Sequence, residues 1–170
     1  MSKKDLKKYL KSLKKDQLEE QFLMLYNKFD EVRIFYNFAF NPKEDKLIGE
    51  AKFRISKEYF PQNKGKAKAR RSVAQNQIRH FLQLGVDPNL IADVMFYNIE
   101  IAQIFSSDKN KITESFSNSM YKSFELAVNF IHQNGITSGF IYRIHKIKEE
   151  AEVQKWPNFY QFEKLTEQFN

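Results

Sequence analysis

The segment from Leu84 to Phe105 constrains the fold of this 170-residue chain more than any other. It opens with the letters LGVDP and continues with apolar residues on almost every side of a helix. Glycine ends helices in the left-handed conformation at no steric cost, and Asp-Pro is typical of an N-cap followed by the first helical residue. A helix that is apolar all round is usually buried. The sequence therefore predicts a corner at Gly85–Pro88 that leads into the central core helix, Pro88–Phe105.

Apolar residues at spacings of three and four predict helices along most of the remaining chain. Ser2 and Asp5 form a candidate capping box, in which each side chain meets the backbone of the other residue. The sequence predicts further helix starts at Asp16, Asp30, Pro42, Ala67 and Ser107-Asp108. The helix from Ala67 to Gln83 is expected to bury Ala74, Ile78, Phe81 and Leu82. Another helix is expected to end at Asn134-Gly135.

The scarcity of turn residues favours an all-α fold. The chain has only five Gly and four Pro, fewer than a barrel or sandwich needs for its turns. Arg33–Phe40 has a β-like composition, but its position after a capped start favours a helix. We therefore expect residues 1–170 to form a single domain of about seven to nine stacked antiparallel helices, arranged as helical hairpins or a short solenoid-like array.

Composition and charge exclude several classes of protein. There is no cysteine, which excludes disulfides, thiolate metal sites and a cysteine nucleophile. The N-terminal lysines are not followed by an apolar run, so no signal peptide is predicted, and no stretch is long and apolar enough to span a membrane. We therefore expect a cytoplasmic location. The formal net charge of +7 favours polyanions or acidic partners.

A basic segment between Tyr59 and Val86 is the first candidate for a binding surface. It contains six cationic residues and no carboxylate: Lys64, Lys66, Lys68, Arg70, Arg71 and Arg79. Closely spaced cations on a loop and a helix start can neutralise phosphates and release counterions. Tyr59 and Phe60 stand beside this segment and could stack on bases. The alternatives are that these cations only face solvent or that they pair with internal carboxylates.

A second candidate is polar and lies on the central helix. Asp93, Tyr97 and Glu100 fall at positions i, i+4 and i+7 of a helix that is otherwise suited to burial. A buried carboxylate needs a partner, so we expect Asp93 either to face solvent or to pair with Arg70, Arg71 or Arg79. A binding or metal-holding role for Asp93 and Glu100 is the alternative. His80, His132 and His145 lie in no recognisable motif, and we expect no metal, cofactor or catalytic residue.

Several phrases of the sequence together resemble a family of small helical bacterial proteins that is catalogued only as a domain of unknown function. They are SKKDLKKYLKSLKKDQLEEQ, NPKEDKL, KARRSVAQ and LGVDPNLIADVM. The resemblance is strongest over Ser2–Ser106. It implies a bacterial, cytoplasmic, helical protein, and it implies no activity, cofactor or catalytic residue.

These observations lead to a functional hypothesis with two alternatives. We expect a non-enzymatic binding or adaptor protein whose basic loop-helix segment engages an anionic partner, either nucleic acid or an acidic protein surface. The first alternative is a structural or oligomerisation module whose basic residues only aid solubility. A homo-oligomer is one form that such a module can take. The remote alternative is an enzyme or metal binder that uses Asp93 and Glu100.

Overall fold

A computed structural model describes residues 2–62 and 65–169 of the chain. Over these residues it contains nine α-helices, two short 3-10 helices and no β-strand. The prediction of an all-α fold with seven to nine helices is therefore confirmed. The chain divides into two compact units, Met1–Pro42 and Lys43–Asn170. We describe each unit by itself, and the assignment of residues 1–170 to a single domain stays a prediction.

The N-terminal unit consists of three helices: α1 (Lys3–Ser12), α2 (Lys15–Lys28) and α3 (Asp30–Phe40). The capping box predicted at the start of α1 is present, because Asp5 N–H donates to Ser2 Oγ and the backbone N–H of Ser2 donates to the Asp5 carboxylate. The Arg33–Phe40 segment is helical, as predicted, although Asp30 is the first helical residue and not a cap, and the N-cap residue Phe29 makes no side-chain capping hydrogen bond. None of the residues in these three helices is buried.

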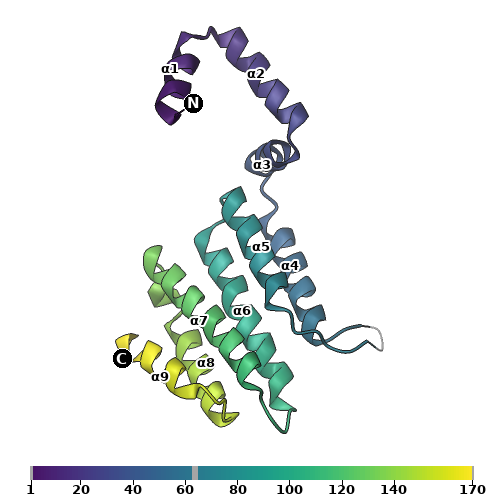
Figure 1. Cartoon of the computed structure of the whole chain (residues 1–170), viewed down its shortest axis with the longest axis vertical. Helices are drawn as coiled ribbons and strands as arrows, with labels where there is room; N and C mark the ends of the chain where they lie inside the picture. Colours follow the sequence, from purple (N-terminus) through teal and green to yellow (C-terminus); the bar gives the residue numbers. More distant parts are fainter. Residues whose placement is uncertain (1, 63–64, 170) are drawn as a thin grey trace. The chain divides into compact units, whose positions relative to one another are not determined.

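The C-terminal unit contains the remaining helices, whose order along the chain is visible in Figure 1. They are α4 (Glu44–Tyr59), α5 (Arg71–Leu84), α6 (Pro88–Ser107), α7 (Glu114–Gln133), η1 (Thr137–Gly139), α8 (Ile141–Val153), α9 (Phe159–Thr166) and η2 (Glu167–Phe169). No helix in the described ranges 2–62 and 65–169 combines the length and the apolar character that crossing a membrane requires.

Helix α6 is the centre of the C-terminal unit, as its sequence predicted. It runs between α5 and α7 and also contacts α4 and α8 (Figure 1). The corner before it has the predicted chemistry, since Gly85 is left-handed (φ +73°) and Asp87 Oδ1 accepts a 2.7 Å hydrogen bond from Asn89 N–H. Pro88 is the first helical residue. Ten of the twenty α6 residues are buried, which matches a helix that is apolar on all sides.

Helix α5 begins later than the sequence predicted, at Arg71 instead of Ala67. The backbone N–H groups of Lys68 and Ala69 both donate to the carbonyl oxygen of Glu58, each at 2.9 Å. Ala69 has a positive φ of 47°, which an α-helix cannot contain. The preceding helix therefore holds this backbone in an extended return segment, and the lysines before Arg70 lie outside the helix.

Three further details of the predicted helices were wrong. Helix α4 begins at Glu44 and not at Pro42. In α5, Phe81 and Ala74 are buried as expected, but Leu82 is 52% exposed and Leu84 is buried in its place. The long helix α7 begins at Glu114 and not at Ser107-Asp108. The α6 helix continues through Ser107, and the hydroxyl of Thr113 caps α7 by accepting from Phe116 N–H.

Candidate functional site

The basic segment predicted from the sequence does not act as one set of free cations. Lys64 lies outside the described residues. Lys66 and Lys68 are exposed on the connection between α4 and α5, and Arg79 is exposed on α5. Arg70 and Arg71 instead have partners within the unit. The segment therefore divides into exposed cations, namely Lys66, Lys68 and Arg79, and two arginines that bind other residues of the unit.

Arg70 forms an ion pair with a glutamate at the end of α4. Its Nε and Nη2 atoms donate to the two carboxylate oxygens of Glu58, each at 2.8 Å. The hydrogen bonds from Arg70, together with its charge and that of Lys68, lower the pKa of the Glu58 carboxyl below its usual value, against the effect of burial. Since Glu58 also holds the return segment through its carbonyl oxygen, this one residue fixes both the backbone before α5 and the side chain of Arg70, the N-cap residue of α5.

The Glu58–Arg70 pair gives a prediction for the pH dependence of stability. The folded pKa of Glu58 is lowered, so the pair stabilises the fold above the unfolded pKa of about 4.3, and this contribution is lost as pH falls through the folded pKa. Arg70→Ala is expected to lower the free energy of unfolding at neutral pH, and the difference from the wild type should vanish in acid. Urea denaturation at a series of pH values measures it. Arg79→Ala is the control, and a pH-independent difference for Arg70→Ala would contradict the assignment.

Arg71 is anchored between α5 and α7. Its Nε atom donates to Ser123 Oγ at 2.8 Å, and its two terminal nitrogens lie 2.8 and 2.9 Å from the Gln75 amide oxygen in the amide orientation that satisfies both groups. Burial lowers the pKa of the Arg71 guanidinium. Arg71 therefore contributes to the packing of α5 against α7, and its charged group is partly buried.

One end of the C-terminal unit gathers exposed lysines around aromatic rings. The rings of Phe60 and Phe105 pack edge to face with centroids 6.1 Å apart, and Phe105 also contacts Phe116 at 6.3 Å. The Phe60–Phe105 contact joins the start of the α4–α5 connection to the last turn of α6, which leads into the α6–α7 connection. We call this surface the basic end and define it by five exposed lysines: Lys57, Lys66, Lys68, Lys109 and Lys111.

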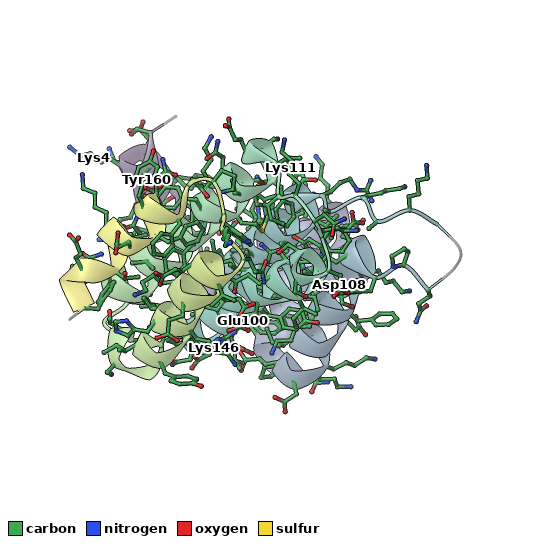
Figure 2. The ribbon with its side chains drawn as sticks, turned by 90° about the horizontal axis from the view of Figure 1, so that it is seen from below. Lys4, Glu100, Asp108, Lys111, Lys146 and Tyr160 are labelled. Carbon is green, nitrogen blue, oxygen red and sulfur yellow. The ribbon has the colours of Figure 1, made fainter. Side chains whose placement is uncertain are left out.

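Two shallow hollows lie in the basic end. One, of about 180 Å³, is lined by Phe105, Phe116, Lys109 and Lys111 among others, and Lys109 Nζ lies 4.5 Å from the centroid of the Phe105 ring. The other, of about 200 Å³, is lined by Lys57, Pro61, Gln62 and Gly65. Figure 2 views the molecule from below and labels Lys111 and Asp108 on the α6–α7 connection. Two exposed carboxylates, those of Asp108 and Glu114, lie nearby in sequence. The basic end therefore contains more lysines than acidic residues, but acidic residues are also present near it.

The two aromatic residues expected to stack on bases differ in their exposure. Tyr59 is only 2% exposed, its hydroxyl lies 3.5 Å from Asn98 Oδ1, and burial raises its pKa far above the usual value. It belongs to the core and cannot stack on a ligand. Phe60, the next residue, is 44% exposed. Phe60 therefore remains as the candidate stacking residue.

The second candidate, Asp93 with Tyr97 and Glu100, lies in a partly buried ion-pair network. Arg143 of α8 donates from Nη1 to Asp93 Oδ1 at 2.8 Å, and from Nε and Nη2 to the two Glu100 oxygens at 2.6 and 2.7 Å. Lys52 of α4 lies 2.6 Å from Asp93 Oδ2, and its Nζ is 5.2 Å from the centroid of the Tyr97 ring. We call this set the Arg143 network.

The charges of the Arg143 network are matched across three helices. Burial disfavours the charged guanidinium, but its hydrogen bonds to Glu100 and Asp93 outweigh that effect and raise the pKa of Arg143. The partners of Asp93 are Lys52 and Arg143 and not Arg70, Arg71 or Arg79, the arginines proposed from their nearness in sequence. The arginines at the start of α5 instead meet Glu58 at the end of α4 and Ser123 on α7.

Sequence reasoning missed Lys52 and Arg143 as members of this site. A weak signal exists for Arg143, because it stands between the apolar residues Phe140 and Ile144 of an inward-facing stripe. Beside the network, a groove of about 430 Å³ is lined by Glu100, Arg143, Tyr142 and Lys146 among others (Figure 2 labels Glu100 and Lys146). Within the described part of the chain, no three His, Asp or Glu residues are grouped as metal ligands would be.

Comparison with known proteins gives a family but no activity. A family model matches residues 1–170, and its description is that of a family of unknown function. No curated protein matches the chain, and no solved structure does.

Proposed function

The chain belongs to this family of unknown function, DUF6155, and we propose that it is a non-enzymatic binding protein that holds an anionic partner, a single nucleic-acid strand, on its basic end. The observation that supports this most is the combination of four exposed lysines with exposed aromatic surface at one end of the unit. Lys66 and Lys68 come from one connection and Lys109 and Lys111 from another, and the Phe60–Phe105 contact joins the start of the first connection to the last turn of α6, which leads into the second.

The chemistry of a single strand fits this surface. Lysines that neutralise phosphates release condensed counterions, which supplies most of the non-specific affinity for nucleic acid. An exposed aromatic ring adds a platform on which any base can stack, worth about 1–3 kcal/mol per base. Phe60 is the ring with the required exposure, and it packs against Phe105, over which Lys109 lies. An acidic protein face would use the lysines and leave the rings without a role, so the nucleic-acid strand is favoured.

The arginines of the original basic segment have a different role in this proposal. Arg70 and Arg71 hold the base of the α4–α5 connection through Glu58 and Ser123. They position Lys68 and the residues before it, and they are not counted as ligand contacts.

The test is binding of fluorescently labelled single-stranded DNA and RNA, followed by anisotropy at several salt concentrations. Lys66, Lys68, Lys109 and Lys111 are replaced together by alanine, and the matched control replaces four exposed lysines elsewhere: Lys46, Lys122, Lys146 and Lys164. The basic-end variant is expected to lose affinity by on the order of 10- to 100-fold and to reduce the slope of log K against log salt by about 3, since each single-strand contact contributes about 0.7. The control keeps the wild-type slope within experimental error.

Three outcomes would overturn the proposal. The wild-type chain shows no binding at low salt, or both lysine variants lose affinity equally, which would indicate a general charge effect. In the third, the wild-type chain binds an acidic peptide such as polyglutamate and no nucleic acid, which would favour an acidic protein partner. Circular dichroism of each variant confirms that its helices are intact.

A further inference from the structure

The N-terminal unit leaves its apolar side chains uncovered. Over residues 2–42, helices α1, α2 and α3 contain no buried residue. Seven of the eleven residues of helix α3 are apolar or aromatic, and Asp30, Arg33 and Asn37 share one side of it, a pattern typical of a helix that buries a wide apolar face. The sequence of this unit is therefore suited to an environment that the unit does not supply to itself.

Helices α2 and α3 meet through a small aromatic cluster. The ring of Tyr36 packs edge to face on Phe22 at 5.7 Å and stacks with Phe40 at 6.1 Å. The Tyr26 hydroxyl donates to Asn37 Oδ1 at 2.9 Å. Between the helices lies an apolar groove of about 400 Å³, lined by Phe22, Leu23, Tyr26, Tyr36, Asn37 and Phe40. Phe40 at its edge is 85% exposed.

The total exposed apolar area of the α2–α3 region is comparable to the area that one partner buries in a standard interface. Eight large apolar side chains of the α2–α3 region are between 38% and 85% exposed: Phe22, Leu23, Met24, Leu25, Phe29, Ile34, Phe35 and Phe40. With roughly 150–250 Å² for each aromatic side chain and less for the aliphatic ones, they leave on the order of 700 Å² open. A standard interface buries about 800 Å² on each partner.

The size of the unit narrows the ways in which it can be stabilised. A folded segment of about 40 residues usually needs a disulfide, a metal or association with another chain. The sequence has no cysteine, and the described residues of this unit contain no group of metal ligands. Of these three means of stabilising the unit, association with another chain is the one that remains.

Charge identifies a second copy as a suitable partner. Helix α1 carries five lysines and a single carboxylate, whereas α2 and α3 together carry five carboxylates and three cations. Each copy therefore offers a basic helix and an acidic helix pair. In a two-fold arrangement the same patch meets itself, so each complementary contact occurs twice.

We propose that the N-terminal unit is a dimerisation element, in which the α2–α3 faces of two copies pack together and Phe40 of each enters the groove of the other. The groove and the most exposed aromatic side chain lie on the same surface, which makes this surface self-complementary. Burial of Phe40 in an apolar groove stabilises the dimer, and the glutamates and aspartates of α2 and α3 lie within reach of the lysines of the other copy's α1. This inference does not depend on nucleic-acid binding.

The first experiment measures the mass of the full chain in solution by light scattering over a wide range of concentrations. The expected mass is about twice the 20.3 kDa of one chain. Phe40→Glu is expected to weaken the dimer by more than about 100-fold, because it places a charge in an apolar groove at the centre of the interface. Tyr160→Glu, at an exposed aromatic residue of α9, is the matched control and keeps the wild-type mass.

The second experiment uses the absence of natural cysteines. Two single variants, Phe40→Cys and Leu23→Cys, are mixed and treated with a short bismaleimide. Each chain then carries a single cysteine, so every cross-link joins two chains. A linked dimer that forms in this mixture and not in a mixture of Phe40→Cys with Tyr160→Cys supports the proposal. A wild-type chain that is a monomer at every concentration overturns it. The proposal is also overturned if the chain is a monomer whose melting temperature falls in Phe40→Glu, because the same chain would then cover this face. A monomer that binds anionic vesicles through this unit overturns it as well.

Discussion

Replacing Phe124 with alanine is expected to lower the free energy of unfolding by about 3–5 kcal/mol, the usual range for a phenylalanine lost from a packed core. Phe124 on α7 is fully buried. Its ring stacks on Phe162 of α9 with centroids 5.2 Å apart and meets Phe96 of α6 edge to face at 6.5 Å. The substitution therefore removes contacts to two other helices and leaves a cavity that neither can fill. Urea denaturation followed by circular dichroism measures the change.

A neighbouring residue of the same helix supplies the control for Phe124. Leu126 lies two positions further along α7 and is 48% exposed. Leu126→Ala removes a side chain of similar character from a position that contributes little to the core, and its cost should stay below about 1 kcal/mol. Equal losses for the two variants would contradict the proposed position of Phe124 at the junction of α6, α7 and α9.

Replacing Arg143 with methionine is expected to destabilise the C-terminal unit by about 2–4 kcal/mol. Removing one partner of a buried ion pair costs about 3–5 kcal/mol because the other charge stays desolvated, and partial exposure of this network reduces that figure. Arg143 serves both Asp93 and Glu100, whose side chains are about 30% exposed, and its guanidinium also lies over the ring of Phe96 at 5.3 Å. Methionine keeps most of the side-chain volume, so the measured loss reports the charge. Thermal and urea unfolding provide the measurement.

The control for Arg143 removes the acids that it neutralises. Asp93→Asn and Glu100→Gln combined with Arg143→Met should recover part of the lost stability, because no carboxylate is then left without its guanidinium. If the triple variant is as unstable as the sum of the single losses, the three side chains act independently and the network assignment is wrong.

The parts of the fold that the sequence predicted best rest on local chemistry. Gly85 and Asp87–Pro88 form a corner whose residues each have a single structural role, and that corner is present. The core position of α6 followed from apolar residues on all its sides, a property that requires no knowledge of its neighbours. The end of α7 at Asn134-Gly135 is equally local, since Gly135 adopts φ +68° there.

The errors arose where a distant segment competes with local preference. The residues from Ala67 to Arg70 have good helix propensity, but the backbone of Lys68 and Ala69 bonds to the carbonyl of Glu58 instead. Nothing in the sequence shows that Glu58 offers this acceptor. Leu82 is exposed for a related reason, because the helical stripe is wider than the surface that the neighbouring helices cover.

The partners of the candidate sites depend on tertiary packing in the same way. Asp93, Tyr97 and Glu100 were selected because polar residues on an apolar helix are unusual. That reasoning identifies the polar residues themselves, but it does not identify the side chains that pair with them. Arg143 lies 43 residues from Glu100 and 50 from Asp93 along the chain, and only the packing of α8 against α6 brings them together. The assembly of the basic end from two connections is likewise a result of packing.

The central position of α6 also determines how the C-terminal unit loses its structure. Helices α4, α5, α7 and α8 each contact α6, so opening α6 uncovers a face of all four at once. Partial unfolding that leaves α6 exposed is therefore costly, whereas fraying of α9 at the end of the chain uncovers fewer neighbours. The unit should lose its structure as one cooperative block around α6, and amide hydrogen exchange in that helix should occur only through global unfolding.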